Sequence, residues 1–313
     1  MSRTGFVDHT DYDLHVQSQG HPECPERLQS IRLELRARNL MNKLYKLQIE
    51  PLSIEHLLRV HAQDYIDTVI KISERGGGLL DDGDTVACKF SYQAANLAAS
   101  GVIQASNAIM QKSIKNAFCA VRPPGHHALS HRAMGFCIFN NISLVARYLQ
   151  EKYSIKKILI IDFDVHHGNG TQDIFYDDSS VYFFSTHQYP FYPGTGSADE
   201  IGRGAGEGFT MNVPLEAYSG GNKILEALEG PLYSAMQIYK PEFILLSSGY
   251  DAFHLDPVGG LQVKREEFRQ INKVALKMAN EFCQGRLISV LEGGYNTEIL
   301  GKLVADQVED FLQ

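Results

Sequence analysis

Short apolar runs alternate with longer amphipathic stretches along most of the chain. The runs have the length and the β-branched and aromatic content of buried strands, and they cover residues 117–121, 157–165, 181–187, 243–251 and 287–295. Stretches with helical periodicity separate several of them, most clearly at 91–111, 140–151, 222–239 and 265–282. This alternation predicts an α/β fold with a mainly parallel central sheet and helices on both of its faces.

Polar side chains gather where these apolar runs end. GHH follows the first run, DVHH closes the second, GYD closes the fourth and GGY closes the fifth. Open parallel sheets bind their ligands beyond the carboxyl ends of the strands. Several loops are therefore expected to converge on one active site at that edge of the sheet.

The cluster within IDFDVHHGNGTQ (161–172) indicates a bound cation. Strand alternation through the motif would put Asp162, Asp164 and His166 on the same side. Burial of two carboxylates is very costly unless a cation or a set of hydrogen-bond donors lies among them. The motif contains no Lys or Arg, so a metal ion is favoured over a salt-bridged strand end.

A further metal ligand is expected from SSGYDAFHLDPVGG (247–260), which offers Asp251 and Asp256. Asp251 ends its strand directly, whereas Asp256 precedes a proline in a tight turn, where an aspartate usually serves the backbone. Asp164, His166 and Asp251 then form a set of N/O ligands with a vacant fourth position, which is typical of one catalytic zinc ion. Two anionic ligands formally cancel the charge of zinc, so a separate general base is needed to activate its water.

The general base is expected in RPPGHHA, where His126 and His127 follow a rigid turn. One imidazole can accept the proton of the water while the other holds charge, if each Nδ1 is oriented by an acceptor. Asp162 and Asn169 are the candidates for these acceptors. In LEGGYN, Tyr295 follows two glycines, and its hydroxyl could reach a developing oxyanion opposite the metal.

Composition and charge narrow the class of protein. The 313 residues, 44% of them hydrophobic, contain no repeat, low-complexity segment or linker, so one domain spanning 1–313 is expected. A net charge of -8 argues against a dedicated nucleic-acid binder. Five cysteines without a C-x-x-C pair favour free thiols and a cytoplasmic location. No run approaches the ~20 apolar residues of a membrane span, so no membrane partner is expected.

Six motifs, read in order, resemble those of the zinc-dependent histone deacetylase family. They are RPPGHHA, GFCIFNN, IDFDVHHGNGTQ, FYPGTG, SSGYDAFHLDPVGG and LEGGYN, with HPECPERL preceding them near the N-terminus. The resemblance covers nearly the whole chain and implies the arginase/deacetylase fold and zinc-dependent hydrolysis of an amide. HPECPERL, DPVGG and Asn169, where the first class usually has Asp, make the chain similar to the second class and its bacterial relatives. Those relatives include histone deacetylase-like and acetylpolyamine amidohydrolases.

The resemblance also implies a role for each candidate residue. Its zinc ligands fall on the same three residues chosen above, Asp164, His166 and Asp251. Zinc and Tyr295 would polarise the acetyl carbonyl. His127, assisted by His126 in its pair with Asp162, would activate the water and protonate the leaving amine. Asn169 would orient His127 without adding charge, so His127 is expected to be a weaker base than in relatives that carry Asp there.

Potassium ions and a substrate channel are further implications of the resemblance. A potassium ion beside the zinc would use Asp162, Ser185 and the backbone carbonyls of Asp164 and His166. A second, more distant potassium site would lie near Phe175, Asp178 and Val181. The residues expected along the channel are Gly135, the aromatic walls Phe136 and Tyr192, Val258, and Asp82 as an acceptor for the substrate backbone.

Val258 bears on the substrate, because polyamine-selective relatives of the second class carry a glutamate at the matching position. A valine cannot pair with the extra ammonium groups of a polyamine. An acetylated lysine in a peptide or protein is therefore the expected substrate, with an acetylpolyamine or another small acylated amine as the alternative. A homo-oligomer is compatible with the resemblance, and a neighbouring subunit could then supply an acidic group.

Two other functions share this fold but fit the sequence less well. An arginase-like ureohydrolase with two manganese ions needs carboxylates at D-x-H-x-D and D-x-D-x-x-D-P, where this chain has Gly168 and Phe253. A non-catalytic reader of acyl-lysine would not need every catalytic position filled, and here all of them are, Tyr295 included. Cys137 is not expected to act as a nucleophile, because an apolar surround raises the pKa of a thiol.

Overall fold

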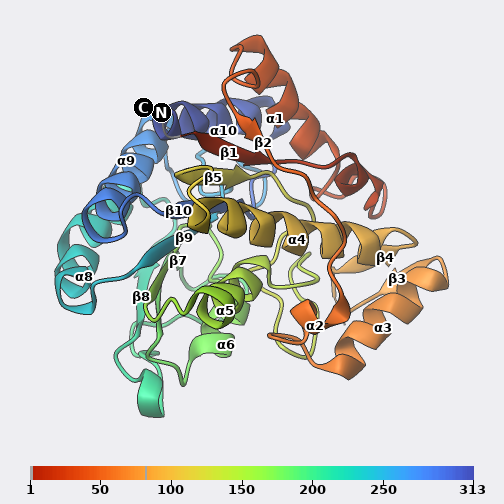
Figure 1. Cartoon of the computed structure of the whole chain (residues 1–313), viewed down its shortest axis with the longest axis horizontal. Helices are drawn as coiled ribbons and strands as arrows, with labels where there is room; N and C mark the ends of the chain where they lie inside the picture. The colour runs from red at the N-terminus through yellow and green to blue at the C-terminus, as the bar shows by residue number, and fades with distance from the viewer. Residues whose placement is uncertain (1–2, 82) are drawn as a thin grey trace.

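A parallel sheet of eight strands forms the centre of the molecule, in the order β2-β1-β5-β10-β9-β6-β7-β8 (Figure 1). The computed structural model describes residues 3–81 and 83–313. Within them, the strands of this sheet are β1 Thr4–Val7, β2 Tyr45–Lys46, β5 Asn116–Cys119, β6 Ile158–Asp162, β7 Val181–Gln188, β8 Thr210–Leu215, β9 Phe243–Ser248 and β10 Leu287–Leu291. A separate antiparallel ribbon consists of β3 Gly77–Leu79 and β4 Val86–Cys88.

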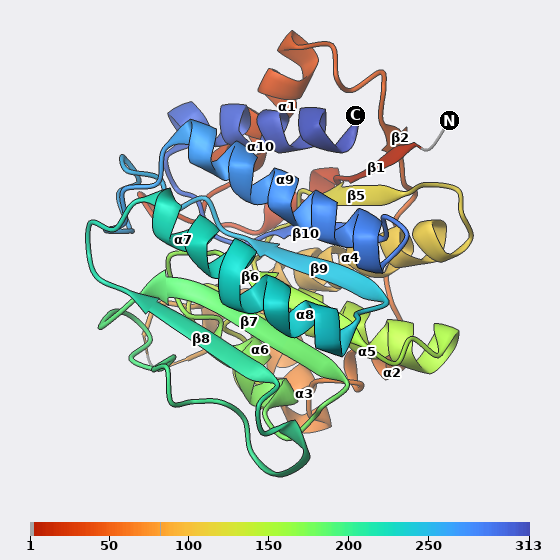
Figure 2. The ribbon, with the colours of Figure 1, turned by 90° about the vertical axis from the view of Figure 1, so that its left-hand side faces the viewer.

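Helices cover both faces of the sheet. Figure 2 shows α7, α8 and α9 in front of it, with α4 and α5 behind, and α1 packs along α10. The helices are α1 Glu26–Ala37, α2 Ile54–Leu57, α3 Gln63–Glu74, α4 Ser91–Met110, α5 Asn141–Tyr153, α6 Asn169–Phe175, α7 Gly221–Ala227, α8 Tyr233–Tyr239, α9 Arg265–Phe282 and α10 Thr297–Phe311. This arrangement confirms the predicted α/β class and the parallel sheet.

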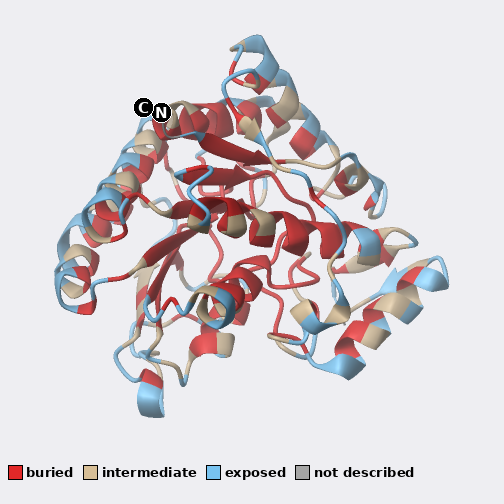
Figure 3. Ribbon diagram, in the orientation of Figure 1, coloured by how far each residue is buried: buried red, intermediate tan, exposed pale blue. Residues whose placement is uncertain are grey.

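The sheet is buried because its strands are apolar on both faces. Every residue of β6 (ILIID), β9 (FILLSS) and β10 (LISVL) is buried, as expected of a parallel sheet between two layers of helices. Figure 3 shows this burial continuing into α4, whose many alanines let it lie close to the strands. No helix in the described part of the chain is long and apolar enough to cross a lipid bilayer.

The observed elements are shorter than the predicted ones in two informative places. The strands β6, β9 and β10 end at Asp162, Ser248 and Leu291, so the polar residues that follow lie in loops. The predicted helix 222–239 is broken into α7 and α8 by a π-helical turn, Leu228–Leu232, which contains Pro231. A proline has no N–H to donate and crowds the preceding turn, so the helix widens at that point.

Candidate active site

Three side chains that can bind a metal ion meet just beyond the ends of β6 and β9. Nδ1 of His166 lies 3.1 Å from Oδ1 of Asp164 and 3.2 Å from Oδ2 of Asp251. One ligand atom from each residue lies within 4.8 Å of the others, and all three residues are buried. The sequence predicted these three residues as a ligand set, and the fold brings them together.

The loop after β6 is shaped by its own carboxylates rather than by strand alternation. Oδ1 of Asp162 accepts a hydrogen bond from the Asp164 N–H at 3.1 Å, and Oδ1 of Asp164 accepts one from the His166 N–H at 2.9 Å. Strand alternation, the expected cause of this grouping, does not apply beyond Asp162, where the strand ends, although the side chains of Asp162 and Asp164 both face His126. A repeating turn in which each carboxylate caps the backbone replaces the strand.

Glycines make room for the crowded carboxylates. A Cβ atom at Gly249 would lie 2.0 Å from Oδ2 of Asp164, and one at Gly293 would lie 2.0 Å from Oδ2 of Asp251. The N–H of Gly293 donates to Oδ2 of Asp164 at 2.8 Å. The glycines of SSGYD and LEGGY are thus needed because the backbone passes directly against the metal-binding side chains.

The donor set fits a divalent cation. Oδ2 of Asp251 is buried and receives no hydrogen bond from any described residue. Burial and the adjacent Asp164 carboxylate raise the pKa of Asp251 to about 7, which shows how much the negative charges here lack compensation. A cation among two carboxylates and an imidazole would remove this cost, and zinc is one of the ions that bind such N/O sets.

The two adjacent histidines have separate hydrogen-bond partners, and their pKa values are shifted in opposite directions. Nδ1 of His126 donates to Asp162 at 2.9 Å, and Nδ1 of His127 donates to Asn169 at 2.7 Å. Burial alone would lower the pKa of His126, but Asp162 and Asp164 raise it to about 10. Burial and the charge on His126 lower the pKa of His127 well below its usual value. His126 is therefore suited to hold a positive charge, and His127 is suited to accept a proton at Nε2.

Tyr295 lies beside the metal-binding group, held by its surroundings. The Arg27 guanidinium lies over its ring at 4.8 Å, and Phe136 meets the ring edge-on with centroids 5.9 Å apart. Its backbone N–H donates to Asp256 at 2.7 Å. Asp256 also accepts hydrogen bonds from the N–H groups of Val258 and Asn296, as expected of an aspartate that serves the backbone of a turn.

Aromatic side chains surround the entrance to this group. The rings of His127 and Tyr192 meet edge-on at 5.3 Å. Gly135 has a φ of +56°, and a Cβ atom there would lie 2.4 Å from Cδ2 of His127, so only glycine fits. Phe191, which the motif reading did not single out, stacks on His166 with centroids 5.3 Å apart.

The acidic loop LLDDGDT was expected to contribute a residue to the mouth of the substrate channel. Asp82, expected at the channel mouth, lies outside the described residues. Asp84 is half-buried and lines a pocket of about 240 Å³ together with Asp81, Arg132 and Tyr192. LLDDGDT contains three acidic residues. The sequence offered no way to decide which of them faces the aromatic wall.

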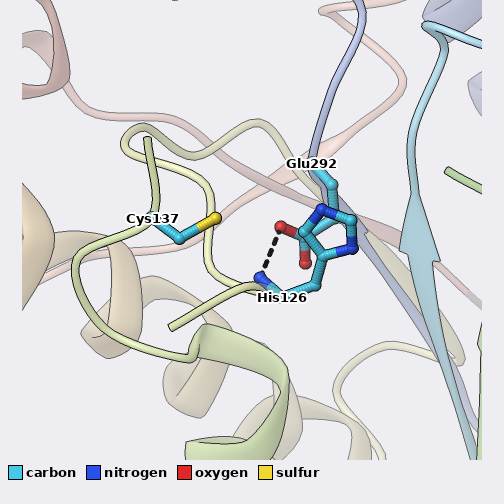
Figure 4. A group of neighbouring side chains, drawn as sticks. All are labelled: His126, Cys137 and Glu292. Atoms are coloured by element: carbon cyan, nitrogen blue, oxygen red, sulfur yellow. Dashed lines mark hydrogen bonds between the residues drawn. The ribbon is translucent and has the colours of Figure 1, made fainter. Parts of the chain in front are cut away.

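Glu292 was also missed, although it lies within a quoted motif. It is fully buried just after β10, and burial raises its pKa to about 7. Figure 4 shows it beside His126 and Cys137, with its carboxylate accepting the His126 N–H. Burial raises the pKa of Cys137 as well, which agrees with the expectation that this thiol is not a nucleophile.

Fold and site together define a class of protein. Residues 21–311 match the histone deacetylase domain family, and the chain belongs to that family. A probable deacetylase of Archaeoglobus fulgidus is 39% identical over 94% of this chain and 82% of its own length. A histone deacetylase-like amidohydrolase of Pseudomonas aeruginosa is 36% identical over 88% of this chain and 73% of its own. The crystal structure of the HDA15 HD domain superimposes with a TM-score of 0.94 at 33% identity, covering 99% of this chain and 88% of that one.

Proposed function

We propose that this protein is a zinc-dependent deacylase that removes acetyl groups from lysine side chains, with one zinc ion per chain. The observation that carries the proposal is the convergence of Asp164, His166 and Asp251 with Tyr295 and with His127, whose pKa burial holds well below its usual value. Amide hydrolysis requires a polarised carbonyl, an activated water and a proton for the leaving amine. Groups of the right kind for each requirement lie within this one site.

Asp164, His166 and Asp251 would hold the zinc ion. Bound there, zinc would supply Lewis-acid polarisation of the acetyl carbonyl and of a water molecule. His127, whose Nδ1 is fixed by Asn169, would take the proton of the water at Nε2 and later deliver it to the leaving amine. His126, fixed by Asp162, would carry positive charge beside the reacting group.

The remaining candidate residues support the catalytic group. The Tyr295 hydroxyl would donate a hydrogen bond to the oxygen that becomes negative in the transition state. Gly135, Phe136 and Tyr192 would form the walls around the aliphatic stem of the lysine. We place the acceptor for the substrate backbone at Asp84, which shares a pocket with Tyr192.

Potassium is part of the proposal as a structural ion. Asp162 and Ser185 lie opposite each other across β6 and β7, which suits an ion bound by them and by the carbonyls of Asp164 and His166. The carboxylate of Asp178 already accepts hydrogen bonds from Arg147 and Ser180. A second potassium ion near Phe175 and Val181 would therefore use the backbone carbonyl of Asp178.

A site with two metals is disfavoured by the space around Gly168. A Cβ atom at this position would lie 2.2 Å from Oδ2 of Asp162, so the carboxylate that an arginase-like site needs there has no room. Phe253, at the other diagnostic position, is buried in the hydrophobic core. We therefore keep a single metal ion in the proposal. The non-catalytic reader is excluded if the chain turns over an acylated amine.

The free cysteines and the net charge of the chain support a cytoplasmic location and acylated amines as partners. All five cysteines are free, which supports a reducing cytoplasmic compartment. The acidic net charge of -8 supports acylated amines, and not nucleic acid, as partners. We also keep the prediction that 1–313 form one catalytic domain.

Removal of the metal is expected to abolish hydrolysis. After exhaustive chelation, turnover of a fluorogenic acetyl-lysine amide should fall below detection, because the carbonyl and the water lose their polarisation. One equivalent of Zn²⁺ per chain should restore it, as measured by initial rates and metal analysis. Hydrolysis that persists in demonstrably metal-free protein would contradict the zinc mechanism.

Acetyl-lysine peptides are expected to be better substrates than acetylpolyamines. The difference in kcat/KM should be ~10-fold or more, since one missing charge contact is worth at least ~1.4 kcal/mol. Val258→Glu should raise kcat/KM for acetylspermidine, and Val258→Gln, which has the same size without the charge, should not. Equal or better use of acetylspermidine by the native chain would overturn the lysine assignment and leave the zinc mechanism standing.

A further inference from the structure

The side chain of Glu292 contacts the chain segments of both neighbouring strands. It follows β10, which lies between β5 and β9 in the sheet. The chain leaving β5 carries His126 and His127, and the chain leaving β9 carries Asp251. The backbone of Glu292 is itself fixed, since its N–H donates to the Ser248 carbonyl at 3.1 Å and its carbonyl accepts from Arg27.

The Glu292 carboxylate holds the backbone that carries the histidine pair. Oε2 accepts hydrogen bonds from the N–H groups of Gly125 at 2.7 Å and His126 at 3.1 Å. Oε1 accepts the Ser247 hydroxyl on β9 at 3.1 Å. Among the described residues, no Lys or Arg forms an ion pair with this carboxylate, although it is fully buried.

The contacts of Glu292 favour a structural role over metal binding together with His126 and Cys137. His126, Cys137 and Glu292 lie close enough to hold an ion (Figure 4). Both carboxylate oxygens, however, are already engaged by N–H and O–H donors, which a cation would have to displace. The buried thiol of Cys137 also resists deprotonation, and only a thiolate binds a metal well.

We propose that Glu292 is a positioning residue, which holds the His126–His127 backbone at the distance from the metal ligands that turnover requires. The inference rests on the proposed deacylase function. Three further hydrogen bonds from outside the segment are accepted by its backbone carbonyls: Asn141 donates to Pro123, the Thr171 N–H to His126 and Asn140 to Ala128. Glu292 accepts the N–H groups of Gly125 and His126, while Asp162 and Asn169 orient the two rings at Nδ1, so the reach of Glu292 sets where the backbone of the histidine pair lies.

Two substitutions separate the reach of this side chain from its charge. Glu292→Asp keeps the charge but withdraws the oxygens by one methylene. Glu292→Gln keeps the length, and its amide oxygen can accept both N–H groups while its NH₂ donates to the Ser247 hydroxyl. Ser247→Ala is the control, since it removes one contact of Glu292 and leaves both contacts to the histidine segment.

Positioning predicts that Glu292→Asp lowers kcat ~100-fold, because a displacement of ~1 Å of a catalytic group has that cost. The KM of Glu292→Asp should stay within ~2-fold of the native value, and the variant should still bind one zinc ion per chain. Glu292→Gln and Ser247→Ala should keep at least about a third of the native kcat. Loss of activity in Glu292→Gln equal to that in Glu292→Asp, or native activity in Glu292→Asp, would overturn the assignment.

Hydrogen exchange gives a readout independent of turnover. The amide protons of Gly125 and His126 should lose protection in Glu292→Asp and keep it in Glu292→Gln, while the amides of β10 stay protected in both. If the native chain hydrolyses no acylated amine, the proposed function fails. The exchange rates then still decide whether Glu292 holds this segment, and unchanged protection in Glu292→Asp would refute that.

Discussion

Tyr295→Phe is expected to lower kcat by ~100-fold or more, the typical cost of removing one hydrogen-bond donor to an oxyanion. The substitution removes only the hydroxyl. The edge-on contact with Phe136, the Arg27 guanidinium over the ring and the backbone hydrogen bond to Asp256 all stay possible. The variant should therefore fold normally and bind one zinc ion per chain, and KM should change less than kcat.

Steady-state kinetics on an acetyl-lysine peptide, with metal content and thermal unfolding in parallel, test this expectation. Tyr192→Phe is the matched control, because Tyr192 also lies near His127 but has no proposed role for its hydroxyl. It should keep most of the native kcat. Near-native turnover by Tyr295→Phe would remove this residue from the mechanism, and loss of zinc from the variant would point to a structural effect.

Asp251→Ala and Asp256→Ala are expected to fail in different ways. Asp251→Ala removes one of the proposed ligands, so zinc affinity should fall by more than the ~100-fold that loss of an outer partner costs, and turnover should fall with it. Asp256→Ala leaves the N–H groups of Val258, Tyr295 and Asn296 without their acceptor. This change should cost roughly 3 kcal/mol of unfolding free energy while the protein still binds one zinc ion.

Metal analysis after dialysis at defined free Zn²⁺, together with denaturant unfolding of the metal-free proteins, distinguishes the two residues. Removal of Asp251 should cost the metal-free protein less stability than removal of Asp256, because it leaves only the Val165 N–H without its acceptor and also relieves the repulsion between the Asp251 and Asp164 carboxylates. The reverse pattern, zinc lost from Asp256→Ala and retained by Asp251→Ala, would exchange the two residues in the ligand set.

The convergence of Asp164, His166 and Asp251 was predictable because chain order and strand direction fix where they meet. Apolar runs identified β6 and β9, and parallel strands deliver the residues after their carboxyl ends to one edge. A turn with a proline distinguished Asp256 from Asp251. The exact ends of the strands were not predictable, since the apolar residues Phe163 and Val165 continue the pattern beyond Asp162, where β6 ends.

Residues that act through the backbone were beyond the reach of sequence reasoning. Glu292 resembles any acidic residue next to a turn until the structure shows Gly125 and His126 donating to it. The short strands β1 and β2 carry too few apolar residues for a clear periodic signal, and they are placed by pairing with residues far along the chain. The sequence also could not show which acidic residues of LLDDGDT line the pocket beside Tyr192, because this depends on the path of one loop.

The parallel order of the strands also has a consequence for how the protein is made. Val165 and Asp251, which share a hydrogen bond at the metal-binding group, are separated by 86 residues in the chain. Pairing of strands far apart in the chain loses the entropy of a long loop before the new contacts stabilise it, so such sheets form slowly. The ion can bind tightly only when both segments are already in place. Loading of the proposed metal ion is therefore expected in the last stage of folding, after most of the chain has left the ribosome.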